Sequence, residues 1–148
     1  MRVYLDTSVI SALFDARNPQ RMSVTEAFFR ASTGFELFTS TITLGEIAQT
    51  PDPVLRENLH SLASQMSLLS VSETIEWLAR EYIRCGAIPK GHPEDALHIA
   101  LAVQNEMDFL LSWNFKHLVR RKTKDIIRMV NSLNQLRHVE IISPGEMM

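Results

Sequence analysis

Short apolar runs alternate with longer stretches of helical hydrophobic spacing along the chain. Runs of apolar, β-branched and aromatic residues are typical of buried strands. The expected strands cover residues 2–5, 35–41, 66–71, 109–112 and 139–142. Helices are expected at about residues 9–14, 20–32, 43–50, 53–65, 73–85, 93–107, 115–119 and 123–136. The alternation predicts a single-domain α/β/α sandwich with a mostly parallel central sheet.

The chain has 148 residues, of which 45% are hydrophobic and 22% charged, as in ordinary water-soluble domains. Residues 1–148 are therefore expected to form one domain with a sizeable core. Cys85 is the only cysteine, which excludes an intrachain disulfide and suits a reducing compartment. No apolar run approaches the roughly 20 residues that span a bilayer, and we find no export signal. We expect a cytoplasmic protein without a membrane partner.

Basic residues gather in one segment of a chain that is otherwise acidic. Lys and Arg number 15 against 17 acids, a net charge of −2. Residues 113–138 carry seven basic side chains and the single acid Asp125, a net of +6, so the rest carries −8. Because affinity for a polyanion depends on local charge, this segment is a candidate phosphate-binding face. A solvated helix face is the alternative explanation.

Three carboxylates stand at expected helix starts, and each alone has a structural explanation. Asp6 can cap the first helix. Glu46 follows Thr43 by three residues, as in a capping box. Asp95 lies in the first turn after Pro93, where the helix dipole favours an acid.

Taken together, the same acids indicate a site. In a parallel sheet, helix N-termini meet at the carboxyl edge of the strands, where open α/β sheets bind ligands. Asp6, Glu46 and Asp95 should lie at this edge, and Asn114 follows an expected strand at the same edge. Crowded carboxylates repel one another unless a cation binds, and oxygen ligands suit Mg²⁺ or Mn²⁺. The pattern predicts a metal site for phosphoryl chemistry.

Four short motifs resemble those of the PIN-domain ribonucleases, in particular the VapC-like toxins of toxin–antitoxin pairs. They are Val3-Tyr4-Leu5-Asp6-Thr7-Ser8, Thr43-Leu44-Gly45-Glu46-Ile47, Glu94-Asp95-Ala96-Leu97-His98-Ile99-Ala100 and Leu110-Leu111-Ser112-Trp113-Asn114-Phe115-Lys116-His117-Leu118. The resemblance spans essentially the whole chain. The family's acids fall on Asp6, Glu46 and Asp95. Its fourth acidic position falls on Asn114, where Asp is commoner.

The resemblance implies a PIN-like, Rossmannoid fold and the hydrolysis of RNA, leaving a 5′-phosphate and a 3′-hydroxyl. We expect one Mg²⁺ or Mn²⁺ ion, because the neutral amide of Asn114 brings no charge to hold a second. Asp6 and Asp95 would bind the ion directly. Glu46 would bind it through water or orient the attacking water, and Thr7 or Asn114 would position a metal-bound water.

Further residues are candidates for substrate and partner binding. The side chains that could hold RNA phosphates are Lys116, His117, Arg120 and Arg121. The resemblance implies a cognate antitoxin and a homodimer, and the apolar residues that could meet either partner are Leu13, Phe14, Phe28 and Phe29. His98 could be a metal ligand and Trp113 a base-stacking residue, but core packing is the favoured interpretation of both.

Other classes of protein share parts of this pattern. A catalytically inactive PIN-like module would bind RNA or a partner with the same fold, and the missing fourth acid leaves this alternative open. A metal-dependent phosphatase of small esters would use the same pocket without the basic segment. A haloacid-dehalogenase-type phosphatase is excluded, because Ser8 stands where that chemistry needs a second Asp.

Overall fold

The computed structural model describes residues 1–147, so Met148, the predicted end of the domain, lies outside the described residues. The strands are β1 (Arg2–Leu5), β2 (Glu36–Ser40), β3 (Ser67–Leu69), β4 (Phe109–Leu111) and β5 (Glu140–Ile142). They form one sheet in the order β3-β2-β1-β4-β5, and every neighbouring pair is parallel. The predicted α/β fold is confirmed, with a sheet that is parallel throughout.

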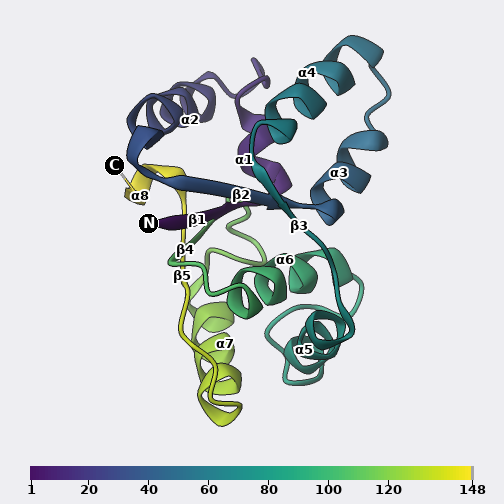
Figure 1. Ribbon diagram of the computed structural model, residues 1–148, viewed down its shortest axis with the longest axis vertical. Helices are drawn as coiled ribbons and strands as arrows, with labels where there is room; N and C mark the ends of the chain where they lie inside the picture. Colours follow the sequence, from purple (N-terminus) through teal and green to yellow (C-terminus); the bar gives the residue numbers. More distant parts are fainter. Residues whose placement is uncertain (148) are drawn as a thin grey trace.

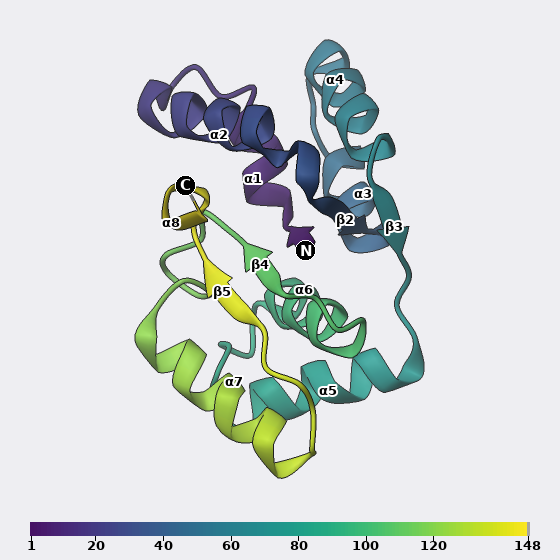
Figure 2. The same cartoon turned by 60° about the vertical axis from the view of Figure 1, so that its left-hand side comes forward.

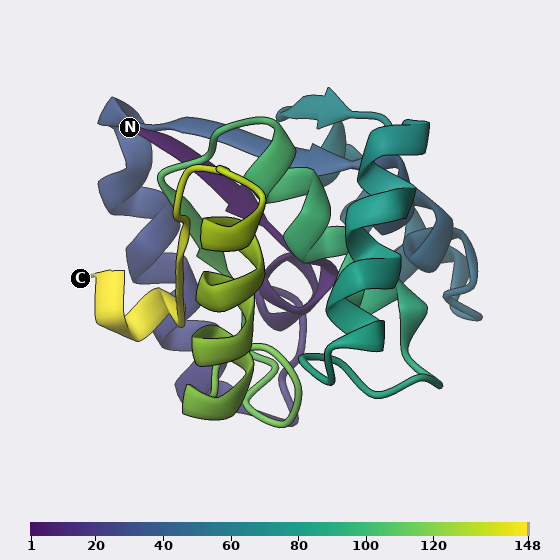
Figure 3. The same cartoon turned by 90° about the horizontal axis from the view of Figure 1, so that it is seen from below.

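Helices cover both faces of the sheet, as predicted for a sandwich (Figure 1). One side carries α1 (Thr7–Ala12), α2 (Pro19–Ala31), α3 (Thr41–Ala48) and α4 (Pro53–Ser64). The other carries α5 (Glu73–Arg84), α6 (Pro93–Gln104) and α7 (Arg121–Leu133), with α5 and α7 in front of α6 when seen from below (Figure 3). The longest helices among residues 1–147 have 13 residues, and none is long and apolar enough to cross a membrane.

Each face of the sheet has its own core because helices cover both. Val3, Tyr4 and Leu5 of β1 are all 0% exposed, and their side chains alternate between the two faces. Val3 and Leu5 pack in the same cluster as Phe28 of α2, whereas Tyr4 packs in the cluster that contains Leu101 of α6. The uninterrupted apolar run at the N-terminus is therefore a central strand buried on both sides.

The start of α3 differs from the prediction. The helix begins at Thr41, and Ser40 caps it, because the Ser40 hydroxyl accepts a hydrogen bond from the Thr43 N–H at 3.4 Å. The predicted capping box of Thr43 and Glu46 is therefore wrong. Thr43 is buried inside the first turn, and Glu46 lies a further turn along the helix.

Two segments near the C-terminal end also differ. Residues 115–119, predicted as a short helix, form turns. The Asn114 carbonyl holds them by accepting hydrogen bonds from the N–H groups of Leu118 and Val119, at 3.0 and 2.9 Å. The short helix α8 (Pro144–Met147), which packs against α2 (Figure 2), was not predicted because four residues carry no apolar periodicity.

The carboxyl ends of the three central strands meet at one edge of the sheet. Asp6 follows β1, Ser40 ends β2 and Ser112 follows β4. Because Leu5 pairs with Leu111, Asp6 and Ser112 leave the sheet side by side. The parallel topology therefore gathers polar side chains at this edge.

Candidate functional site

Asp6 lies at the junction of β1 and α1, where it is the N-cap of α1 as predicted. The residue is only 4% exposed. Its Oδ1 accepts hydrogen bonds from Ser8 Oγ at 2.5 Å and from the Val9 N–H at 3.3 Å. Its Oδ2 accepts one from Ser112 Oγ at 2.5 Å. These neutral donors fix the carboxylate without supplying positive charge.

The electrostatics of Asp6 are dominated by lost hydration. Burial raises the pKa of Asp6, and the charge of His98 and the hydroxyl hydrogen bonds lower it by less, so the net shift of the pKa is upward. Among residues 1–147, no Lys or Arg forms an ion pair with Asp6, Glu46 or Asp95. The edge therefore carries more negative than positive charge.

Glu46 lies on α3 and joins α1 to α6. Its Oε1 accepts a hydrogen bond from Thr7 Oγ1 at 2.8 Å and lies 2.8 Å from His98 Nε2. Burial raises the pKa of Glu46, but the hydrogen bond and charge of His98 lower it by more, so the carboxyl group is ionised at neutral pH. The side chain is 39% exposed, which leaves the second oxygen open to a ligand.

The imidazole of His98 on α6 ties Glu46 to the core. It is 2% exposed, and its Nδ1 lies 2.7 Å from the hydroxyl of Tyr4, which donates to Ser40 Oγ at 2.7 Å. A hydroxyl has one proton, so Nδ1 must donate to Tyr4 while Nε2 donates to Glu46. Burial lowers the pKa of His98, but the bond to Glu46 and the charge of Asp6 raise it by more. The hydrogen-bond pattern and the direction of the pKa shift both favour the imidazolium form of His98.

Asp95 lies in the first turn of α6, as predicted. Its Oδ2 lies 2.9 Å from His117 Nδ1 and accepts a hydrogen bond from Asn114 Nδ2 at 3.4 Å. Asn114 Oδ1 accepts one from the His117 N–H at 2.9 Å, which leaves the amide engaged at both ends. The Asn114 N–H donates to Ser112 Oγ at 2.9 Å, and the same hydroxyl donates to Asp6. Ser112 thus links the two acids.

The structure brings all five predicted catalytic residues to this edge. They are Asp6, Thr7, Glu46, Asp95 and Asn114. Thr7 and Glu46 form one hydrogen-bonded group, and Asp95 and Asn114 form another that reaches Asp6 through Ser112. The charge of His98 acts on all three acids.

The predicted phosphate-binding residues lie at different distances from this edge. His117 contacts Asp95 directly. Lys116 and Arg121 are exposed, and Arg121 Nε lies 3.8 Å from Asp125. Arg120 Nε donates to Thr123 Oγ1 at 2.8 Å. The basic segment therefore starts at the acids and continues along the surface of α7.

A cleft of about 390 Å³ opens beside Asn114, between α1, α2 and the turn after β4. Arg21 lines this cleft, with its guanidinium carbon 5.2 Å from the centre of the Trp113 ring. Trp113 Nε1 donates to Thr25 Oγ1 at 3.0 Å, and the ring packs on the core beneath α2, as the packing interpretation predicted. The cleft thus places a cation and an aromatic ring next to the acids.

The predicted partner-docking residues divide between core and surface. Phe28 is 0% exposed and belongs to the core. Leu13 and Phe29 are partly buried and line a groove of about 340 Å³, and Phe14 lines another of about 450 Å³. Apolar grooves therefore exist on the α1, α2 and α4 side of the molecule.

Sequence reasoning missed the residues that hold the acids. Ser112 could have been found from the parallel topology, because the residue after β4 must stand beside the residue after β1. Tyr4 could also have indicated a buried polar partner, since a tyrosine in a buried strand needs a hydrogen-bond partner for its hydroxyl. The link between His98 and Glu46 spans 52 positions in sequence and carries no local signal.

Asp6, Glu46 and Asp95 offer carboxylate oxygens, the ligands that a hard divalent cation prefers. In the described chain these oxygens do not all lie within 4.8 Å of one another, so an ion between them would need waters to complete its ligand set. Such an ion takes carboxylate oxygens and keeps several waters, which the exposed side of Glu46 allows. The charge around the buried Asp6 also favours a bound cation. In the described chain, His98 is the one side chain that has a raised pKa and hydrogen-bonds to any of these acids, so positive charge from the protein is scarce at this edge.

Fold and site together define an α/β protein with an acidic site at the carboxyl edge of a parallel sheet. A sequence profile of the PIN domain matches residues 3–117, and the chain belongs to the PIN domain family. The predicted resemblance is confirmed. Among curated proteins, no sequence matches the chain significantly.

Several solved structures share the fold. VapC20 of Mycobacterium tuberculosis, a toxin that cleaves the sarcin-ricin loop, is 16% identical with a TM-score of 0.63, over 78% of this chain and 92% of that one. VapBC-1 of nontypeable Haemophilus influenzae is 17% identical with a TM-score of 0.62, over 97% and 98%. VapBC2 of Rickettsia felis, bound to promoter DNA, is 13% identical with a TM-score of 0.60, over 95% and 97%.

Proposed function

We propose that this chain is a metal-dependent endoribonuclease that hydrolyses phosphodiester bonds, the toxin of a toxin–antitoxin pair, with residues 1–148 as one nuclease domain. One observation carries the proposal: Asp6, Glu46 and Asp95 meet at the carboxyl edge of the sheet without a Lys or Arg ion pair among residues 1–147. Carboxylates gathered in this way favour a bound cation, and PIN domain membership makes phosphoryl chemistry its natural use.

Asp6 and Asp95 would bind Mg²⁺ or Mn²⁺ directly, with Glu46 binding through water. When bound, such a cation polarises a phosphate and lowers the pKa of a nearby water. Glu46 is suited to orient the attacking water and take its proton, because its second oxygen is open while Oε1 is held by Thr7 and His98.

Thr7 and Asn114 are proposed as residues that orient the acids. The Thr7 hydroxyl donates its hydrogen bond to Glu46, so its proposed role is to orient this carboxylate rather than to donate to a metal-bound water. Asn114 donates to Asp95 and accepts from His117, which fixes the carboxylate against the turn after β4. Both residues would thereby keep the ligands ready before substrate arrives.

RNA is the substrate that the surroundings favour. The cleft beside Asn114 offers the charge of Arg21 to a nucleotide, and the exposed Lys116 and Arg121 offer charge to neighbouring phosphates. Cleavage would leave a 5′-phosphate and a 3′-hydroxyl. A phosphatase of small esters would need none of this basic surface.

The partner is proposed to be an antitoxin protein, because two of the structural neighbours are VapBC complexes. The apolar grooves lined by Leu13, Phe14 and Phe29 suit such a partner or a second copy of the chain in a homodimer. We propose the cytoplasm as its compartment, which the single cysteine suits.

The test is the cleavage of end-labelled structured RNA by Asp6→Asn, with Asp52→Asn as the matched control. Asp52 caps α4 far along the chain and makes only backbone hydrogen bonds. We expect Asp6→Asn to lose all Mg²⁺-dependent cleavage while its circular dichroism stays native, and Asp52→Asn to cleave like the wild type. Full activity of Asp6→Asn would refute the assignment, and RNA binding without cleavage in the wild type would favour the inactive module.

A further inference from the structure

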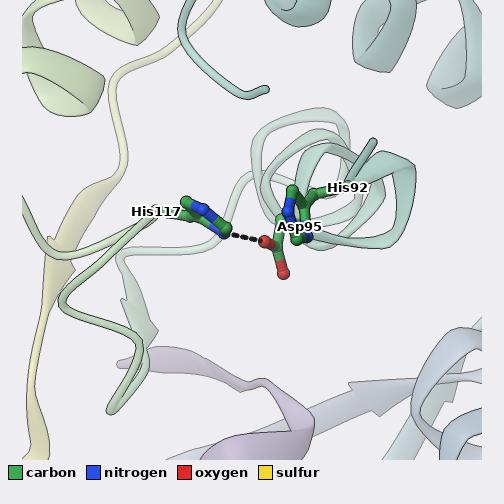
Figure 4. A group of neighbouring side chains, drawn as sticks. All are labelled: His92, Asp95 and His117. Carbon is green, nitrogen blue, oxygen red and sulfur yellow. Dashed lines mark hydrogen bonds and ion pairs between the residues drawn. The ribbon is translucent and has the colours of Figure 1, made fainter. Parts of the chain in front are cut away.

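Two imidazoles, those of His92 and His117, lie beside the Asp95 carboxylate. His92 is the N-cap residue of α6, Asp95 lies in its first turn, and His117 lies in the turn after β4. One ligand atom from each of the three lies within 4.8 Å of the other two (Figure 4). The ring centres of His92 and His117 are 4.1 Å apart. Segments far apart in sequence thus present two nitrogens and one oxygen to one point.

The proposed nuclease chemistry makes no use of these nitrogens. Mg²⁺ and Mn²⁺ in oxygen-rich sites prefer carboxylates and water, whereas imidazole suits the borderline ions, Zn²⁺ among them. We propose that His92, Asp95 and His117 form a second cation site, selective for a borderline divalent ion of the Zn²⁺ class over Mg²⁺. The proposal rests on the nuclease function only in that Asp95 would serve both sites.

The spacing fits a tetrahedral ion after a small adjustment. Ligand bonds of about 2.0–2.1 Å separate neighbouring ligand atoms by roughly 3.3 Å in a tetrahedron. His117 Nδ1 and Asp95 Oδ2, at 2.9 Å, would move apart by about 0.4 Å as the ion replaces the shared hydrogen-bond proton. His92 is exposed and needs only a side-chain rotation. Three protein ligands leave the fourth position to water.

The ligands are held before any ion arrives. The side chain of His117 is 10% exposed, and its N–H donates to Asn114 Oδ1 at 2.9 Å, so the turn that carries it is fixed. Asp95 is fixed by the first turn of α6. Figure 4 shows its second oxygen pointing away from both imidazoles, which leaves that atom outside this cluster. Such preorganised partners raise metal affinity.

The test measures metal binding directly on untagged full-length protein, because a polyhistidine tag would bind Zn²⁺ itself. Zn²⁺ is titrated by calorimetry in excess Mg²⁺, and Co²⁺ is titrated by visible absorption, whose d–d bands report nitrogen and oxygen ligation. The variants are His92→Ala, with His60→Ala on the exposed surface of α4 as the matched control.

We expect one Zn²⁺ per wild-type chain, binding at least tenfold weaker in His92→Ala, and no change in His60→Ala. Asp6→Asn should keep this Zn²⁺ binding while losing cleavage, which separates the second site from the nuclease proposal. The proposal is overturned if the wild type binds neither Zn²⁺ nor Co²⁺ in excess Mg²⁺, or if His92→Ala binds Zn²⁺ as tightly as His60→Ala does.

Discussion

The hydroxyl of Tyr4 tests the chain of contacts that holds Glu46. Tyr4→Phe removes one oxygen from a fully buried side chain and leaves the ring in place. That oxygen lies 2.7 Å from both Ser40 Oγ and His98 Nδ1. His98 in turn holds Glu46 at 2.8 Å. The substitution therefore disturbs Glu46 through two intermediate contacts without touching the carboxylate itself.

The magnitude follows from the two lost hydrogen bonds. Ser40 Oγ keeps its hydrogen bond from the Thr43 N–H, so the loss of the bond from Tyr4 to Ser40 costs about 1 kcal/mol. The buried imidazolium of His98 loses the acceptor for Nδ1, which costs about 2 kcal/mol. The sum, about 3 kcal/mol, should lower the Tm by roughly 6–12 °C in a chain of this size.

Tyr82→Phe is the matched control. Tyr82 is also fully buried, and its hydroxyl donates to Asn131 Oδ1 at 2.5 Å, between α5 and α7 and away from the acids. We expect it to lower stability by about 1–2 kcal/mol and to leave cleavage unchanged. Tyr4→Phe should reduce cleavage roughly 10–100-fold as well, because it frees a residue that orients a ligand.

The assay combines thermal unfolding, followed by circular dichroism in EDTA, with RNA cleavage at saturating Mg²⁺ and a temperature well below both Tm values. If Tyr4→Phe cleaves RNA at the wild-type rate, His98 does not orient Glu46. If its Tm equals that of the wild type, the hydroxyl does not donate to a buried partner and the imidazolium assignment is wrong.

Three further perturbations test other parts of the site. In metal-free protein the raised pKa of His98 stabilises the fold below its ordinary pKa of 6.5, and this stability is lost as the pH rises through the folded pKa. Urea unfolding should therefore show stability falling as the pH rises above 6.5, and a profile that is flat above that pH would contradict the shift of His98. The raised pKa of Asp6 acts in the same direction, from its ordinary pKa of 3.8 upward. Asn114→Asp places a second carboxylate beside that of Asp95 and should lower the metal-free stability by about 1 kcal/mol, because the two charges repel. The same substitution should tighten Mn²⁺ binding. Unchanged Mn²⁺ binding would show that the neutral amide of Asn114 does not limit the affinity of the site. Reversing Lys116 and Arg121 to Glu should weaken RNA binding and reduce the slope of log affinity against log salt by about 1.4, and an unchanged slope would remove them from the interface.

The fold could be predicted because its signals are local. The apolar run at residues 3–5 and the alternation of strands and helices can be recognised from the sequence alone. The start of α3 was placed wrongly because Ser40 and Thr43 both suit an N-cap, and only the end of β2 decides between them. The turns after Asn114 depend on hydrogen bonds to one carbonyl group, which apolar spacing does not report.

The site could be predicted in part for the same reason. Asp6 and Asp95 sit at helix starts, and parallel topology brings helix starts to one edge. The partners of the acids could not be predicted, because the pairing of His98 with Glu46 and of His117 with Asp95 depends on the packing of α6 against its neighbours. Which charged side chains pair is determined by the packing of the core, because that packing sets the distances between the elements that carry them.

The binding of Mn²⁺, counted by the electron paramagnetic resonance signal of the free ion, shows directly whether the three acids form a metal site. We expect one tightly bound Mn²⁺ per chain in the wild type, weakened at least tenfold in Asp6→Asn and in Asp95→Asn, and unchanged in His92→Ala. Absence of Mn²⁺ binding in the wild type, or equal affinity in the wild type and Asp6→Asn, would contradict the claim that these acids form a metal site.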